Sequence, residues 1–157
     1  MELIYRGSRD GSTAKDFHNK CDNEAPTLCL YKNSKGNIFG GFTTIPWSSP
    51  KNSTYFSDKD SFIFTLTNIY NIEPTKFPNK DNNNDSVRHT FNEGPCFGGG
   101  ADIAVYSDFK KDKLASNFPV TYQDVLEKGR SIFSGDINKN TNTYFYLEEI
   151  EIFKLSK

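Results

Sequence analysis

Residues 27–44, TLCLYKNSKGNIFGGFTT, hold two short apolar runs on either side of a polar turn. TLCLYK and NIFGGFTT have the mixture of large apolar and β-branched side chains that favours strands, and NSKG between them has the composition of a turn. The pattern predicts two antiparallel strands joined as a hairpin. Gly40 and Gly41 lie inside the second strand, where glycine indicates a bulge or a close backbone approach.

Similar patterns recur along the chain. In DSFIFTLTN, residues 60–68, alternation places Phe62, Phe64 and Leu66 on one face, or the whole run is buried if both faces are covered. ADIAVYSD (101–108) and TYFYLEEIEIFKLS (143–156) predict further strands, and residues 71–86 predict an Asn- and Pro-rich surface loop outside the core. We therefore expect a single domain, 1–157, of the α+β class and mainly β: a sandwich of two antiparallel sheets flanked by a few short helices.

The stretch YRGSRDGSTAKDFHNKCD, residues 5–22, gathers many reactive side chains. Its Asp-Gly pair is a turn signal, and Thr13 with Asp16 three residues later is close to a capping box. A short amphipathic helix should follow, because one helical stripe carries Ala14, Phe17 and Cys21.

The composition excludes several classes of function. With 19 Lys and Arg against 20 Asp and Glu, the chain has a net charge of −1 and lacks the basic excess of a nucleic-acid binder. No apolar run approaches the roughly 20 residues that cross a bilayer, and the N-terminus has no signal-peptide core. Three cysteines, an odd number, favour reduced thiols in the cytoplasm over a disulfide framework.

Three kinds of chemistry are alternatives to a structural role for the same residues. A zinc site could use His18, Cys21, His89 and Cys96, but the spacing of the last two is loose and the chain has no CxxC pair. A hydrolase needs a nucleophile and a histidine base, and no serine lies in a GxSxG elbow. Cys96 or Cys21 could instead serve a redox or hydrolytic enzyme as an accessible thiol, although burial as a small apolar residue is the simpler expectation.

Two weaker patterns also have structural interpretations. The run FGGGAD, residues 97–102, lacks the GK[ST] ending of a phosphate loop and precedes a strand, so we interpret it as a tight turn with positive φ. Paired acids at Asp58/Asp60 and Glu148/Glu149 could suit a glycosidase, but charged residues beside strands are usually solvated.

The order of seven motifs resembles that of the TLDc domain family over nearly the whole chain: LIYRGSRDG, AKDFHNKCDNEAPTLCLYK, GNIFGGFTT, Trp47, DKDSFIFTLTN, GPCFGGGADIAV and EIEIFKL. The resemblance implies a two-sheet sandwich with short helices. It also implies an association with protection against oxidative stress and, for several members, binding to the vacuolar-type proton pump (V-ATPase). The family has no generally accepted reaction, so a protein-interaction module is the class it implies.

The family's signature residues carry over to fourteen positions, which we expect to be mainly structural: Ser8, Arg9, Asp10, Gly11, Phe17, Cys21, Asp22, Gly40, Gly41, Trp47, Phe97, Gly98, Gly100 and Asp102. Arg9 and Asp10 should form a charge-assisted network, and Trp47 should plug the end of the sandwich rather than anchor a partner. The sequence departs from the family pattern at Cys96, usually Thr or Ser, and at Ala101, usually His or aromatic. We also expect the helical segment that commonly precedes the family's first motif to be absent, since Met1 lies almost on that motif.

We therefore predict a non-enzymatic TLDc-type module without metal or cofactor that docks on a large assembly. A V-ATPase subunit is the first candidate partner and a cytoskeletal or other scaffold the second, with no nucleic acid and no direct membrane insertion. The expected location is the cytoplasm, peripheral on an organelle or assembly.

Overall fold

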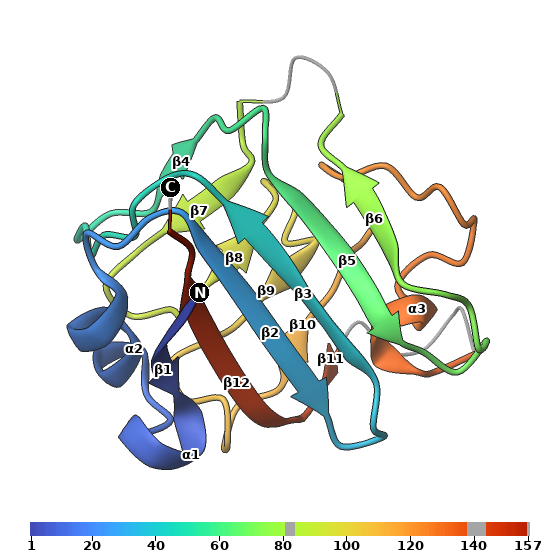
Figure 1. The fold of residues 1–157 in the computed structure, drawn as a ribbon, viewed down its shortest axis with the longest axis horizontal. Helices are drawn as coiled ribbons and strands as arrows, with labels where there is room; N and C mark the ends of the chain where they lie inside the picture. The colour runs from blue at the N-terminus through green and yellow to red at the C-terminus, as the bar shows by residue number, and fades with distance from the viewer. Residues whose placement is uncertain (81–83, 138–143, 157) are drawn as a thin grey trace.

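Two six-stranded antiparallel sheets pack face to face in the computed structural model, which describes residues 1–80, 84–137 and 144–156 (Figure 1). The first sheet contains, in spatial order, β1 (Glu2–Arg6), β12 (Leu147–Lys154), β2 (Thr27–Asn33), β3 (Ile38–Thr43), β5 (Phe62–Thr67) and β6 (Thr75–Pro78). The second contains β11 (Tyr144–Phe145), β10 (Leu114–Ala115), β9 (Ile103–Ala104), β8 (Cys96–Phe97), β7 (Val87–His89) and β4 (Thr54–Phe56). The helices in the described ranges are α1 (Gly7–Asp10), α2 (Ala14–Cys21) and α3 (Ser131–Ser134). The predicted fold class is confirmed.

The hairpin of β2 and β3 is confirmed, with register from Thr27↔Thr43 to Lys32↔Ile38. Asn33 holds its turn, because its Oδ1 accepts from two backbone N–H groups on the far side of the turn, at 2.9 and 3.0 Å. The glycine pair reflects close approach: a Cβ on Gly40 would collide with the Cys29 carbonyl oxygen, and one on Gly41 with the Phe97 ring of the second sheet. The register shift of this strand lies at Ile38/Phe39 instead.

The predicted helix is α2, and its N-terminus has a complete capping box. Thr13 Oγ1 accepts from the Asp16 N–H at 3.2 Å, while the Asp16 carboxylate accepts from the Thr13 N–H at 3.0 Å. Gly11, just before the cap, has φ +113, and a side chain there would collide with Asp16. The Gly11 carbonyl oxygen also accepts a 2.7 Å hydrogen bond from Tyr5 Oη, which ties the turn to β1.

Aromatic rings fill the space between the sheets. Phe133 of α3 contacts three of them, with centroid separations of 5.2 Å to Phe39, 5.6 Å to Phe77 and 5.0 Å to Phe118. In β5 the residues that face this core are Ile63 and Thr65, both 0% exposed. The predicted face of Phe62, Phe64 and Leu66 therefore points away from the second sheet.

The expectation of a surface loop over residues 71–86 is wrong in its centre. Thr75–Pro78 form β6, which pairs with β5 at the edge of the first sheet, and Phe77 is fully buried. One inward phenylalanine is enough to fix this short strand in spite of the surrounding Asn and Pro residues. Residues 81–83, the centre of the Asn tract, lie outside the described residues.

The C-terminal run, predicted as one long strand, forms two strands within the described residues. These are β11 and β12, which belong to different sheets, so the chain crosses between the layers near Tyr146. Between β10 and α3, Asp124 accepts from the N–H groups of Leu126 (3.2 Å) and Gly129 (2.6 Å). These side-chain bonds favour turns over a helix in this segment.

Candidate functional site

The first part of the signature fastens α1 to the first sheet. Asp10 Oδ2 accepts from the Arg6 N–H at 2.9 Å and pairs with the Arg9 guanidinium at 2.7 Å. The hydrogen bond from Arg9 is the main reason that the pKa of Asp10 lies at about 2. Ser8 donates its N–H to Glu149 Oε1 of β12 at 3.0 Å. These polar residues are engaged within the fold.

A second cluster of polar side chains lies at the C-terminal end of α2. His18 Nδ1 lies 2.7 Å from Asp22 Oδ1, and Ser49 donates its hydroxyl to the other carboxylate oxygen. His18 Nε2 lies 2.9 Å from the carbonyl oxygens of both Thr90 and Glu93. Both ring nitrogens thus face acceptors, and the ring joins α2 to the segment that follows β7.

This Ser–Asp–His order does not support nucleophilic catalysis. A catalytic triad needs the histidine between the nucleophile and the carboxylate, so that the ring removes the hydroxyl proton. Here the carboxylate lies between Ser49 and His18, and two backbone carbonyls occupy the nitrogen that would act as the base. The cluster therefore has a structural role: it joins α2 to neighbouring segments of the chain.

Trp47 is 1% exposed and fills the core beside this cluster. Its Nε1–H donates to Thr27 Oγ1 at 2.9 Å, and its ring meets Phe17 edge-on at a centroid separation of 5.5 Å. A bridge between Asp22 and Trp47 joins the backbone after α2 to the loop after β3. Trp47 is therefore a core residue and is not available to a partner.

His89 lies on the other side of Trp47, 1% exposed, with ring centroids 4.9 Å from Trp47 and 4.6 Å from Phe56. Ser48 Oγ lies 2.8 Å from its Nδ1, whereas its buried Nε2 has no hydrogen-bond partner among the described residues. Burial, with a smaller contribution from His18, lowers the pKa of His89 to about 4. His89 is thus neutral at pH 7.

The cysteines are buried, and their environments disfavour the thiolate. Cys21 packs in the core between the sheets, and burial raises its pKa well above the usual thiol range. Cys96 lies on the far side of the second sheet, where burial and then the Glu93 carboxylate raise its pKa to about 12, against the opposing effect of Arg88. Neither has the low pKa and exposure of a reactive cysteine.

The four residues considered for zinc are not assembled into a site. Cys21 and Cys96 lie in separate apolar clusters, and both nitrogens of His18 are already engaged. Across residues 1–80, 84–137 and 144–156, no group of three or more His, Cys, Asp or Glu side chains is placed to hold a metal ion.

The glycine-rich run forms a turn around a buried carboxylate. Asp102, 0% exposed, accepts from the N–H groups of Val120 (2.9 Å), Thr121 (2.9 Å) and Tyr122 (3.1 Å). Gly98 has φ +89, and a side chain there would collide with Asp102. Gly100 lies against Val120, and Phe97 is in the core. The run therefore binds its own chain rather than a phosphate.

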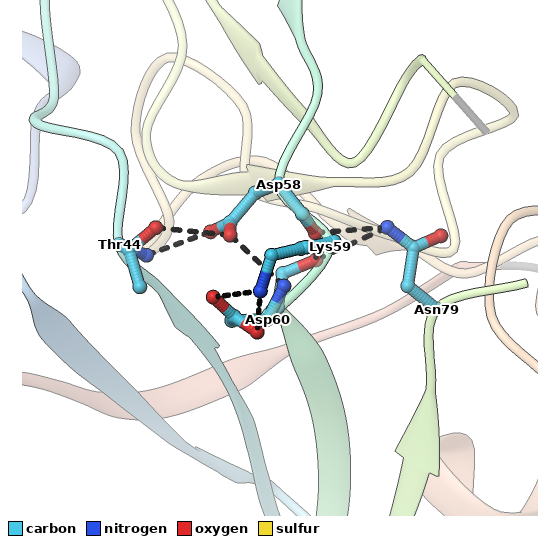
Figure 2. A network of polar contacts seen from close by, with 6 residues as sticks. Thr44, Asp58, Lys59, Asp60 and Asn79 are labelled. Atoms are coloured by element: carbon cyan, nitrogen blue, oxygen red, sulfur yellow. Dashed lines mark hydrogen bonds and ion pairs between the residues drawn. The ribbon is translucent and has the colours of Figure 1, made fainter. Parts of the chain in front are cut away.

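The two acid pairs considered for a glycosidase, Asp58/Asp60 and Glu148/Glu149, do not form a catalytic arrangement either. Figure 2 shows Asp58, 4% exposed, accepting from the Thr44 N–H (2.7 Å) and Thr44 Oγ1 (2.9 Å), while its carbonyl oxygen accepts from Asn79 Nδ2 (3.0 Å). Asp60 is exposed and pairs with Lys59 at 2.8 Å, a contact that Figure 2 also shows. Similarly, Glu148 pairs with Lys32 across the surface at 3.6 Å. Neither pair places two carboxyl groups across a cleft.

An apolar groove on the outer face of the first sheet is the feature that sequence reasoning missed. Its volume is about 310 Å³, and its lining is Leu28, Phe62, Phe64, Thr65, Leu66, Pro74, Thr75 and Lys76. Phe64 lies over Gly40, which leaves room for the ring. The available signal was that both alternating faces of β2 and β5 carry large apolar residues.

Comparison with known proteins agrees with the motif order. A family model for the TLDc domain matches residues 1–156. No curated protein matches the chain significantly. The TLDc family is generally associated with resistance to oxidative stress. No helix within the described ranges is long and apolar enough to cross a membrane. With nearly every residue matched and the motifs placed as above, the chain belongs to the TLDc domain family.

Proposed function

We propose that this chain is a non-enzymatic interaction module of the TLDc type that docks on a large protein assembly in the cytoplasm. The V-ATPase is the first candidate assembly and a cytoskeletal scaffold the second. One observation carries the proposal: the polar signature residues are engaged in contacts within the fold, whereas an apolar groove faces outward on the first sheet. An exposed apolar groove of this kind is typical of a binding surface.

The competing hypothesis is a redox or hydrolytic enzyme that uses Cys96 or Cys21. Two observations count against it. Both thiols are at most 1% exposed, and their pKa values are raised, which keeps them protonated at pH 7. The histidine that contacts a serine hydroxyl directly, His89 beside the half-buried Ser48, has its second nitrogen buried and its ring between two aromatic rings.

The test is co-sedimentation of the purified chain with the purified cytoplasmic sector of the proton pump, and separately with actin filaments and microtubules. We expect stoichiometric binding to one of these assemblies. In parallel, maleimide labelling of the native protein should be uniformly slow at all three cysteines. Absence of binding to every assembly, or one fast-reacting thiol, would contradict the proposal.

A further inference from the structure

The outer face of the first sheet carries an apolar row that crosses all six strands. Its members are cross-strand partners, one from each strand in sheet order: Leu3, Phe153, Leu28, Phe42, Phe62 and Pro78. They point away from the second sheet because their neighbours in the strands, such as Cys29 and Ile63, are buried in the core. None of the six belongs to that core. We call these six residues the outer apolar row.

Five members of the row are half-buried, and the sixth, Pro78, is exposed. Figure 1 shows the first sheet facing the viewer, and no described helix crosses it. Phe42 and Phe62 stack at a centroid separation of 5.1 Å, and the 310 Å³ groove continues from them toward Leu66, which is 40% exposed. A continuous apolar surface of this extent is unusual on a protein that acts alone.

The dimensions of the row fit a helix. Six strands about 4.8 Å apart give a row roughly 24 Å long, which equals the length of a helix of about 16 residues. A second copy of this chain, packed face to face, would need about 800 Å² from each partner. The row itself, about 24 Å by 10 Å, offers about 240 Å², and the groove at Phe64 and Leu66 widens it on one side only. The row is therefore long and narrow, as an α-helix is.

The charges beside the row are unequal at its two ends. At the end formed by β1 and β12, Arg6 pairs with Glu151 at 2.8 Å, so these charges compensate each other. At the β6 end, Lys76 Nζ lies 4.3 Å from the centroid of the Phe62 ring and makes no ion pair with any described residue. The uncompensated charge that borders the row is thus positive and lies at one end.

We propose that the outer apolar row binds an amphipathic helix of a partner protein, which lies across the strands and places an acidic side chain beside Lys76. The apolar side of such a helix covers the rings of Phe42 and Phe62, and its carboxylate pairs with the ammonium group that the sheet leaves uncompensated. The inference rests on the proposed interaction role and states the chemistry of the partner.

The test uses synthetic peptides and the full chain. The first peptide, the glutamate peptide, is a fluorescein-labelled amphipathic helix of 16 residues with leucines on one face and two glutamates near one end. The lysine peptide has lysines in place of the two glutamates. The scrambled peptide has the composition of the glutamate peptide in random order. Fluorescence anisotropy should show binding of the glutamate peptide, about fivefold weaker binding of the lysine peptide, and none of the scrambled one. Phe62→Ser should weaken binding at least about tenfold, and Phe42→Ser repeats the test should Phe62→Ser fail to fold.

Charge reversal supplies the matched control. Lys76→Glu should reverse the preference between the two charged peptides. Lys110→Glu, which changes another exposed lysine, in the turn between β9 and β10, should leave the preference unchanged. Equal binding of both charged peptides, or undiminished binding by a folded Phe62→Ser variant, overturns the inference. The inference is also overturned if the wild-type chain is a dimer in solution and Phe62→Ser dissociates it, because the occupant of the row is then a second copy. If the peptide test fails but the chain still co-sediments with an assembly, only the inference about the partner helix is wrong. If the peptides bind as expected but the chain co-sediments with no assembly, only the proposed function is wrong.

Discussion

Acidification should weaken the fold through one buried residue, His89. Its ring lies between Trp47 and Phe56 and is 1% exposed, so a proton on it would place a charge in the core. Burial lowers its pKa from 6.5 to about 4. A lowered pKa means that the unfolded chain binds this proton more tightly than the folded chain, so stability is complete above about pH 6.5 and falls as the pH drops toward 4.

The size of the effect follows from that difference. A shift of 2.5 units, from 6.5 to about 4, corresponds to a limit of about 3 kcal/mol once the pH falls below both values. Between pH 7.5 and pH 5, the free energy of unfolding should decrease by about 2 kcal/mol through this residue alone. Asp10, whose pKa lies at about 2, contributes mainly below that interval.

Urea denaturation at pH 7.5 and at pH 5, followed by circular dichroism, measures this change. The control is His89→Phe, which keeps an aromatic ring beside Trp47 but cannot bind a proton. We expect the wild type to lose about 2 kcal/mol more than the variant over the interval. Equal losses in the two proteins, or an NMR titration of His89 with a midpoint near 6.5, would refute the reasoning.

Three further substitutions, one of them with a matched control, test the stability of the fold. Thr13→Ala should lower the free energy of unfolding by about 1 kcal/mol, because it removes the cap of α2; a value unchanged in urea titrations would show that the capping box contributes nothing. Gly40→Ala should lower the free energy of unfolding by about 3 kcal/mol or more, because the new Cβ would collide with the Cys29 carbonyl oxygen. Its control, Gly36→Ala, is strained at φ +85 but lies in open space, so it should lower the free energy by only about 1 kcal/mol. Similar shifts in melting temperature for the two variants would contradict this. Trp47→Phe should cost about 2 kcal/mol, since the indole hydrogen bond to Thr27 is lost and a cavity is left, and calorimetry showing no change would contradict it.

Local signals in the sequence predicted local structure well. The capping box of Thr13 and Asp16 and the turn of the β2–β3 hairpin depend on side-chain bonds within a few residues, so composition and spacing reveal them. The strand β6 was missed because its one buried anchor, Phe77, lies in an Asn- and Pro-rich segment, and only the partner strand β5 makes that segment extended. Tertiary pairing there overrides local propensity.

The candidate site was harder to predict for a related reason. The zinc and thiol hypotheses depended on which distant residues meet, and only the fold shows that Cys96 lies on the far side of the second sheet from Cys21. Asp58 and Asp102 are buried carboxylates that accept several hydrogen bonds, but in the sequence they resemble ordinary surface acids. For Asp102, the donating N–H groups lie up to 20 residues away along the chain, which is beyond the range of local sequence patterns.

The distribution of phenylalanine connects composition to the proposed surface. Of the 14 phenylalanines, four lie on the outer face of the first sheet: Phe42, Phe62, Phe64 and Phe153. Alternation in a strand normally assigns one face to the core and the other to water, so apolar residues on both faces indicate that both are covered when the protein acts. The second sheet covers one face. The aromatic surplus of the sequence is therefore explained if a partner helix forms a third layer on the other face.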